Sequence, residues 1–151
     1  MKHYFEPRAA DWSAVTIVAP VDGTVVGMDS EWAGVRISIQ SSAYPEFVLQ
    51  VFHVQPVGGL TPGLALQAGQ TLGTHVGPQT YSDISVRRNG TALVSYFDLV
   101  TEAVFAEYRA RGVPCRSSLI ISREERDGDP LSCSGGSFTN SGTIESWVTL
   151  N

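Results

Sequence analysis

Short apolar runs separated by turn residues fill the first two thirds of the chain. Val35, Ile37 and Ile39 alternate with polar residues, and this alternation predicts a strand with one buried face. A turn signal within residues 19–26 predicts one hairpin, and Asn89-Gly90 between two apolar runs predicts another, with a two-residue type I′ turn. The pattern is typical of a β-rich fold.

Residues 47–54 form the longest of these runs and are apolar at almost every position. A strand with two apolar faces is usually covered on both sides, so we expect this one in the middle of a sheet. A period of two places four of its residues on one face: Phe47, Leu49, Val51 and His53.

The pattern changes after residue 98. Thr101 is a suitable N-cap for a helix over 102–111, which Gly112 would end, and Ser122 with Glu125 fits a capping box that opens a further helical turn. Residues 132–142 are predicted to be a loop and 143–150 a closing strand. We therefore expect one domain over 1–151, with a β core over about 14–97 and a C-terminal extension over about 98–151 that carries one or two short helices.

Composition and charge narrow the possible functions. The chain has 151 residues and a net charge of −5, which argues against a nucleic-acid surface. No apolar run reaches membrane-spanning length, and residues 1–20 lack the apolar block of a signal peptide. Cys115 and Cys133 are close enough in the chain to close a short loop, and we expect a disulfide between them; two free thiols are the alternative.

Three motifs follow one another along the chain in a recognisable order. They are Val51-Phe52-His53-Val54, then LQAGQTLG over 66–73, and YSDISVRRNG over 81–90. Together they resemble the second half of lysostaphin-type (glycyl-glycine) zinc endopeptidases. The resemblance implies a small antiparallel β barrel or sandwich of the duplicated hybrid motif type, with a groove along one sheet. It also implies a periplasmic or secreted protein whose signal peptide has been trimmed; a cytoplasmic protein is the alternative.

The zinc ligands of that family are the part of the pattern that differs here. The family binds zinc through a His-x-x-x-Asp motif and the second histidine of His-x-His, whereas this chain has Tyr81 and Asp83 at the two His-x-His positions. No histidine is followed by aspartate four residues later. Catalytic zinc needs three protein ligands, and the remaining set would be His3, Glu6 and Asp83 at a different spacing. The resemblance is therefore to a degenerate member without zinc.

The candidate binding residues are His53, Tyr81 and Asp83. His53 matches the strand-end catalytic histidine of the family, and Tyr81 and Asp83, two apart on a predicted strand, would share a face. The three would form a polar cluster in the former groove, or would only fix the strands. His75 is expected in a solvated loop. Lys2 is the only lysine, which excludes a biotinyl or lipoyl carrier whose lysine stands on a hairpin tip.

The sequence thus favours a non-catalytic, peptidase-like domain of the bacterial cell envelope. It would bind peptidoglycan peptides or a partner protein through the former substrate groove. One alternative is an active zinc metallopeptidase with rearranged ligands. The other is a purely structural domain whose groove is covered by the extension, where Phe105, Tyr108 and Trp147 are bulky enough to fill it.

Overall fold

The structure is a computed structural model that describes residues 1–135, 137–142 and 147–151. The chain forms two compact units, residues 1–96 and 97–151, and each is described by itself. Among the described residues, no helix is both long and apolar enough to cross a membrane.

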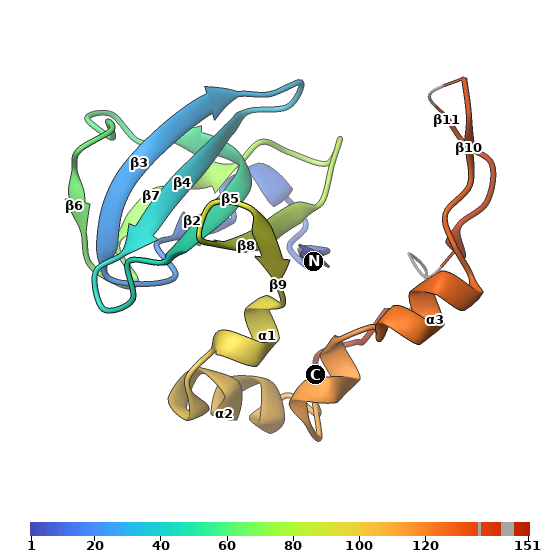
Figure 1. Cartoon of the computed structure of the whole chain (residues 1–151). Coiled ribbons are helices and arrows are strands. Elements are labelled where there is room, and N and C mark those ends of the chain that lie inside the picture. The colour runs from blue at the N-terminus through green and yellow to red at the C-terminus, as the bar shows by residue number, and fades with distance from the viewer. Residues whose placement is uncertain (136, 143–146) are drawn as a thin grey trace. The chain divides into compact units, whose positions relative to one another are not determined.

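The first unit is built almost entirely from strands, with one short 3₁₀ helix, η1, at Trp12–Ala14 (Figure 1). Its strands are β1 (Lys2–Phe5), β2 (Thr16–Val18), β3 (Gly23–Ser30), β4 (Val35–Ser41), β5 (Phe47–Pro56), β6 (Ala65–Leu66), β7 (Thr71–His75), β8 (Ser82–Arg88) and β9 (Ala92–Val94). They form one antiparallel sheet whose main path is β1-β8-β5-β4-β3-β6, while β7 pairs with β2 and β5, and β9 with β8.

The mainly β fold predicted from the sequence is confirmed, as are the short helices in the C-terminal part. All nine strands of the first unit belong to a single sheet, and this sheet is not closed into a barrel. The predicted central strand is β5, which pairs with β4 along one side and with β8 and then β7 along the other. The hairpin at Asn89-Gly90 also forms, but its loop includes Thr91, because Arg88 pairs with Ala92.

The core lies on one face of this sheet. In Figure 1 the long strands β3 and β4 curve in front of β7. Buried apolar residues of β3, β4, β5, β7 and β8 belong to one core cluster. The buried core residues are Ala19, Val25, Ile37, Ile39, Leu49, Val51, Val54, Leu60, Leu66, Leu72, Ile84 and Val86. Gly73 of β7 allows close packing of this strand on β5, because a Cβ there would overlap the carbonyl oxygen of Gln55.

A break in β5 at His53 determines which side chains leave the core face. His53 has a φ of 59°, in the left-handed region that only glycine adopts without strain. On the β4 side, Val35 pairs with Val54 and Ile37 with Val51, so two residues of β5 lie opposite Arg36 alone. Such a β-bulge reverses the alternation beyond it.

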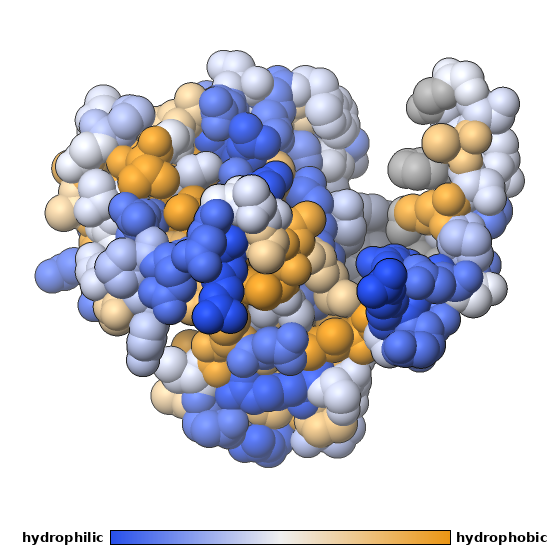
Figure 2. All heavy atoms as spheres, viewed as in Figure 1, coloured by the Kyte–Doolittle hydropathy of each residue, from blue (hydrophilic) through white to orange (hydrophobic). Residues whose placement is uncertain are grey.

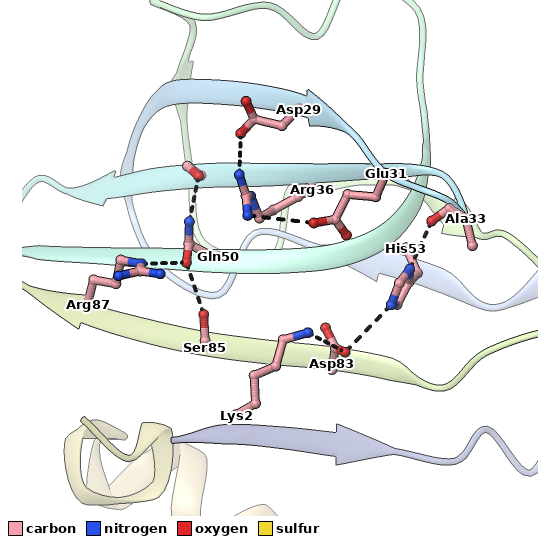
Figure 3. Close-up of polar contacts among 11 residues, drawn as sticks. Lys2, Asp29, Glu31, Ala33, Arg36, Gln50, His53, Asp83, Ser85 and Arg87 are labelled. Carbon is pink, nitrogen blue, oxygen red and sulfur yellow. Dashed lines mark hydrogen bonds and ion pairs between the residues drawn. The ribbon is translucent and has the colours of Figure 1, made fainter. Parts of the chain in front are cut away.

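The bulge overturns the predicted position of His53. Leu49, Val51 and Val54 contribute to the core, whereas His53 joins Phe52 on the opposite face, where its ring contacts Asp83 (Figure 3). The expectation that His53 shares a face with Phe47, Leu49 and Val51 is therefore wrong, because a strict period of two holds only in a strand without an extra residue.

The second unit is helical and small. It contains α1 (Tyr96–Leu99, whose first residue belongs to the first unit), α2 (Glu102–Ala110), η2 (Arg116–Leu119), α3 (Arg123–Gly128) and a hairpin of β10 (Cys133–Ser134) and β11 (Ser137–Phe138). The predicted caps are confirmed: Thr101 Oγ1 accepts a hydrogen bond from the backbone of Val104, and Ser122 and Glu125 form a capping box. The hairpin lies in the predicted loop. Of the predicted closing strand, 143–146 lie outside the described residues, and 147–150 form no strand.

The predicted disulfide is not present. Cys115 and Cys133 are both free and exposed, and they are not close to each other. Cys115 precedes η2, where its sulfur lies 3.0 Å from Ser117 Oγ and 3.2 Å from Ser118 Oγ. Cys133 belongs to β10, and η2 and α3 both lie between the two cysteines in the chain, so a short separation in sequence does not bring them together.

Candidate functional site

Polar and charged side chains gather on the face of the sheet that is turned away from the core. Residues directly opposite each other in an antiparallel pair point to the same side, so the register identifies this face. Ser85 of β8 stands opposite both Gln50 of β5 and Lys2 of β1, and Asp83 stands opposite both Phe52 of β5 and Tyr4 of β1. We call this surface the polar face (Figure 3).

A hydrogen-bonded network around Gln50 ties three strands together at one part of the polar face. The Gln50 amide nitrogen donates to Ser38 Oγ on β4 at 3.3 Å, and its oxygen accepts from Ser85 Oγ and from Arg87 Nε on β8, both at 3.1 Å. Gln50, Ser38 and Ser85 are buried. Because its buried groups have partners, this network fixes the register and offers no free group to a ligand.

The charged centre of the polar face is an ion pair between Lys2 and Asp83. The Lys2 ammonium lies 3.0 Å from Asp83 Oδ2 and 3.7 Å from the centroid of the Phe52 ring, a cation–π distance. The Asp83 side chain is 3% exposed and that of Lys2 33%. The ammonium therefore lies between a buried carboxylate and a buried aromatic ring on one side and solvent on the other.

Asp83 is only partly satisfied by this pair. Its Oδ1 is buried and forms no hydrogen bond with any described residue. Burial raises the pKa of Asp83 above its ordinary value, even though Lys2 and His53 act in the opposite direction, and nearby Glu31 raises it further. A buried carboxylate oxygen without a donor is uncommon, because burial removes its contact with water.

His53 is fixed beside Asp83 from two directions. Its Nδ1 donates to the backbone carbonyl of Ala33 at 2.8 Å, and its backbone oxygen accepts from Val76. With Nδ1 protonated in this way, Nε2 faces Asp83 Oδ2 at 3.6 Å. Its ring and its backbone together therefore hold His53 next to the buried carboxylate of Asp83.

Two exposed aromatic side chains flank the charged centre. Trp32, in the turn between β3 and β4, is 75% exposed, and its ring lies edge-on to His53 at 5.7 Å. Tyr4 of β1 is 48% exposed, and its ring centroid lies 5.7 Å from the Lys2 ammonium. Large exposed aromatic side chains are enriched at binding surfaces. Elsewhere, on the side of the first unit seen in Figure 2, hydrophobic residues form separate patches among hydrophilic ones.

Arg36 of β4 lies next to the Lys2–Asp83 pair and links it to the end of the β3–β4 hairpin. Its guanidinium pairs with Asp29 at 2.9 Å and with Glu31 at 3.6 Å, and its carbon Cζ lies 5.8 Å from the centroid of the Phe52 ring. The polar face therefore carries both signs of charge around the Phe52 ring, an arrangement suited to a ligand that is itself zwitterionic or bears an amide and a charge.

Of the three predicted site residues, the structure brings two together. His53 and Asp83 are in contact, but Tyr81 precedes β8, which begins at Ser82, so strand alternation does not set its direction. The Tyr81 ring packs 6.2 Å from that of Trp12 and is 39% exposed. The assignment of the three residues to a binding role stays a prediction.

His75 was expected in a solvated loop, but it is the last residue of β7. It is 1% exposed, its ring lies edge-on to Trp12 at 5.9 Å, and its Nδ1 accepts a hydrogen bond from the backbone of Gly77. Burial lowers the pKa of His75, an effect that the backbone of Tyr81 offsets in part. The ring is a packing element beneath η1.

The alternative metal set does not assemble. No group of three or more His, Cys, Asp or Glu side chains among the described residues could hold a metal ion. His3 pairs with Ile84, a core residue, and its Nε2 lies 3.0 Å from Ser95 Oγ, so it faces away from Asp83. His3, Glu6 and Asp83 therefore do not form a zinc site.

Lys2 and Trp32 are the site residues that the sequence analysis missed. Both lie outside recognised motifs, and the expected β core began at about residue 14. The signal available was the alternation in Lys2-His3-Tyr4-Phe5, which would have indicated a strand with Lys2 and Tyr4 on one side.

Comparison with known proteins adds no relationship. No protein-family model matches the chain, and no curated protein matches it.

Proposed function

We propose that the first unit is a non-catalytic, peptidase-like domain of the bacterial cell envelope that binds peptidoglycan peptides through its polar face. The proposed relation to lysostaphin-type endopeptidases rests on the motifs over 47–90 described above. The observation that carries the proposal is the Lys2–Asp83 pair: Asp83 stands where the resemblance expects a zinc ligand, and its partner is an ammonium group of the same chain.

The geometry favours binding over zinc hydrolysis. A zinc enzyme of this kind needs three protein ligands around one open position. Asp83 instead has the Lys2 amine and the His53 imidazole beside it, and its buried Oδ1 accepts no hydrogen bond from the described residues. Peptides supply hydrogen-bond donors in their amides and amines, and the exposed rings of Trp32 and Tyr4 offer apolar contact on either side.

The test is retention on purified, insoluble peptidoglycan. Trp32→Ala removes an aromatic ring that is mostly exposed, so the fold should tolerate it, and Tyr44→Ala is the matched control, because Tyr44 is 63% exposed at the other end of β4. We expect Trp32→Ala to bind about tenfold more weakly than wild type, as for an aromatic hot spot, and Tyr44→Ala to bind as wild type does.

Other outcomes would redirect the assignment. Equal retention of both variants and wild type would show that the polar face does not recognise the polymer. Binding to soluble envelope proteins without binding to peptidoglycan would point to a protein partner. Stoichiometric zinc in protein purified without chelator, lost in Asp83→Asn, would favour the metallopeptidase alternative.

A further inference from the structure

The place that the Lys2 ammonium occupies has the features of a binding site for an alkylammonium group. The buried carboxylate of Asp83 lies 3.0 Å from the ammonium, and the centroid of the Phe52 ring, itself 6% exposed, lies 3.7 Å from it. Carboxylates and aromatic faces are the two kinds of group that bind an ammonium ion. The Tyr4 ring, 5.7 Å from the ammonium, adds a third wall.

Lys2 engages one of the two carboxylate oxygens of Asp83. An ammonium group has three N–H donors, yet Lys2 pairs only with Asp83 Oδ2 and leaves the buried Oδ1 without a donor. A ligand that arrives in a different orientation could engage both oxygens. The side chain of Lys2 is also one third exposed, so the ammonium is accessible from solvent while Asp83 and Phe52 lie beneath it.

The strand that carries Lys2 is suited to move. β1 has four residues and lies at the end of the main path of the sheet, and β8 is the one strand among the described residues with which it pairs. Local opening costs less free energy at the edge of a sheet and near a chain end than in its central strands. Displacement of β1 would also expose the edge of β8, to which an extended peptide could add as a new strand.

From these observations we propose that Asp83 and Phe52 form a site for the primary ammonium group of an alkyl chain, as on a lysine-like side chain of a peptide, and that Lys2 on β1 is an intramolecular stand-in that the ligand displaces. This inference rests on the proposed function, because it specifies which group of the peptide the polar face would recognise. The ligand would place its ammonium between Asp83 and Phe52 and its backbone along β8.

Chemical rescue tests the site directly. Lys2→Ala removes the side-chain atoms beyond Cβ, and those atoms correspond to propylammonium. We expect saturating propylammonium chloride to raise the Tm of Lys2→Ala by about 5 °C, as for a ligand that binds only the folded state. Neither n-propanol nor sodium chloride at the same ionic strength should do so, and propylammonium should leave wild type and Lys2→Ala/Asp83→Asn unchanged.

The results that overturn the inference are equally specific. A rise that n-propanol reproduces, or that persists in Lys2→Ala/Asp83→Asn, would mean that no ammonium site exists. The same conclusion follows if folded Lys2→Ala does not respond. If Lys2→Ala does not fold without an additive, refolding yield is measured in place of Tm. Recovery of folded protein with propylammonium but not with n-propanol supports the site. No recovery in either, while the double variant folds without additives, refutes it.

A second comparison identifies the source of the ammonium group. Nα-acetyl-lysine amide carries a side-chain amine, and glycinamide carries an α-amine; we expect the first to stabilise Lys2→Ala and the second not to. Stabilisation by glycinamide alone would contradict the lysine-like assignment. Failure of peptidoglycan retention with successful rescue would remove the proposed function and leave the ammonium site, whereas retention without rescue would do the reverse.

Discussion

Replacing Lys2 by methionine should destabilise the first unit in a way that depends on pH. The variant keeps an unbranched apolar chain over Phe52 but leaves the Asp83 carboxylate without its cation. Two unit charges 3.0 Å apart attract by about 5.5 kcal/mol at an effective dielectric constant of about 20. Because the ammonium is one third exposed, solvent screens much of this, and we expect a loss of about 2 kcal/mol at pH 8.

The direction of the pH dependence follows from the pKa of Asp83. Burial raises it above the ordinary value of 3.8, so the folded state holds the proton to higher pH than the unfolded state does. The contribution of this group to stability is therefore greatest below pH 3.8 and is lost as the pH rises through the folded pKa. Without Lys2, which lowers this pKa, the pKa rises further, so the difference between Lys2→Met and wild type should grow with pH.

Urea unfolding at pH 4.5 and pH 8 measures this effect. We expect the loss in Lys2→Met to be smaller at pH 4.5 than the about 2 kcal/mol at pH 8, because the raised pKa of Asp83 leaves a larger share of the carboxyl protonated at the lower pH. The same substitution in an Asp83→Asn background should cost equally little at both values. A loss that is the same at both pH values in the wild-type background would refute the reasoning, because it would show that packing, and not charge, holds Lys2 in place.

Two further predictions concern the close packing of β7 on β5 and the exposed thiol of Cys115. Gly73→Ala should cost about 3 kcal/mol in urea unfolding, because the new Cβ overlaps the backbone of Gln55, whereas Gly58→Ala, where the Cβ meets nothing, should change stability by less than about 0.5 kcal/mol. Hydrogen bonds from Ser117 and Ser118 lower the pKa of Cys115 to about 7. Its alkylation by iodoacetamide, followed by mass spectrometry, should therefore reach half its maximal rate near pH 7, and Ser117→Ala should shift that midpoint upward.

The elements that the sequence predicted correctly have local causes. The alternation over 35–40, the long apolar run of β5, the Asn89-Gly90 turn and the caps at Thr101 and Ser122 each depend on residues a few positions apart. Such features are encoded where they occur, so a pattern of two or of three to four residues is enough to find them.

The features that the sequence did not reveal depend on partners far away in the chain. Residues 2–5 are a strand through their pairing with β8, and the bulge at His53 lies in the pairing of β5 with β4, at the point where the partner on the other side changes from β8 to β7. The bulge inverted the predicted face of His53, and the late start of β8 left Tyr81 outside the strand. The predicted disulfide between Cys115 and Cys133 is absent, because distance along the chain says little about distance in space.

The candidate site shows the same division. The resemblance to lysostaphin-type endopeptidases implies that His53 lies near Asp83, and the two side chains are in contact. The third participant, Lys2, does not emerge from the motifs, because its contact with Asp83 depends on the pairing of β1 with β8.

The pairing of β1 with β8 and of β2 with β7 also constrains how this unit folds. The meander of β3, β4 and β5 requires only short loops, whereas the Lys2–Asp83 contact joins residues 81 positions apart. Closing so long a loop costs more chain entropy, so we expect the meander to nucleate folding and β1 to dock last. The segment that completes the charged centre is then also the one that can detach without dismantling the rest.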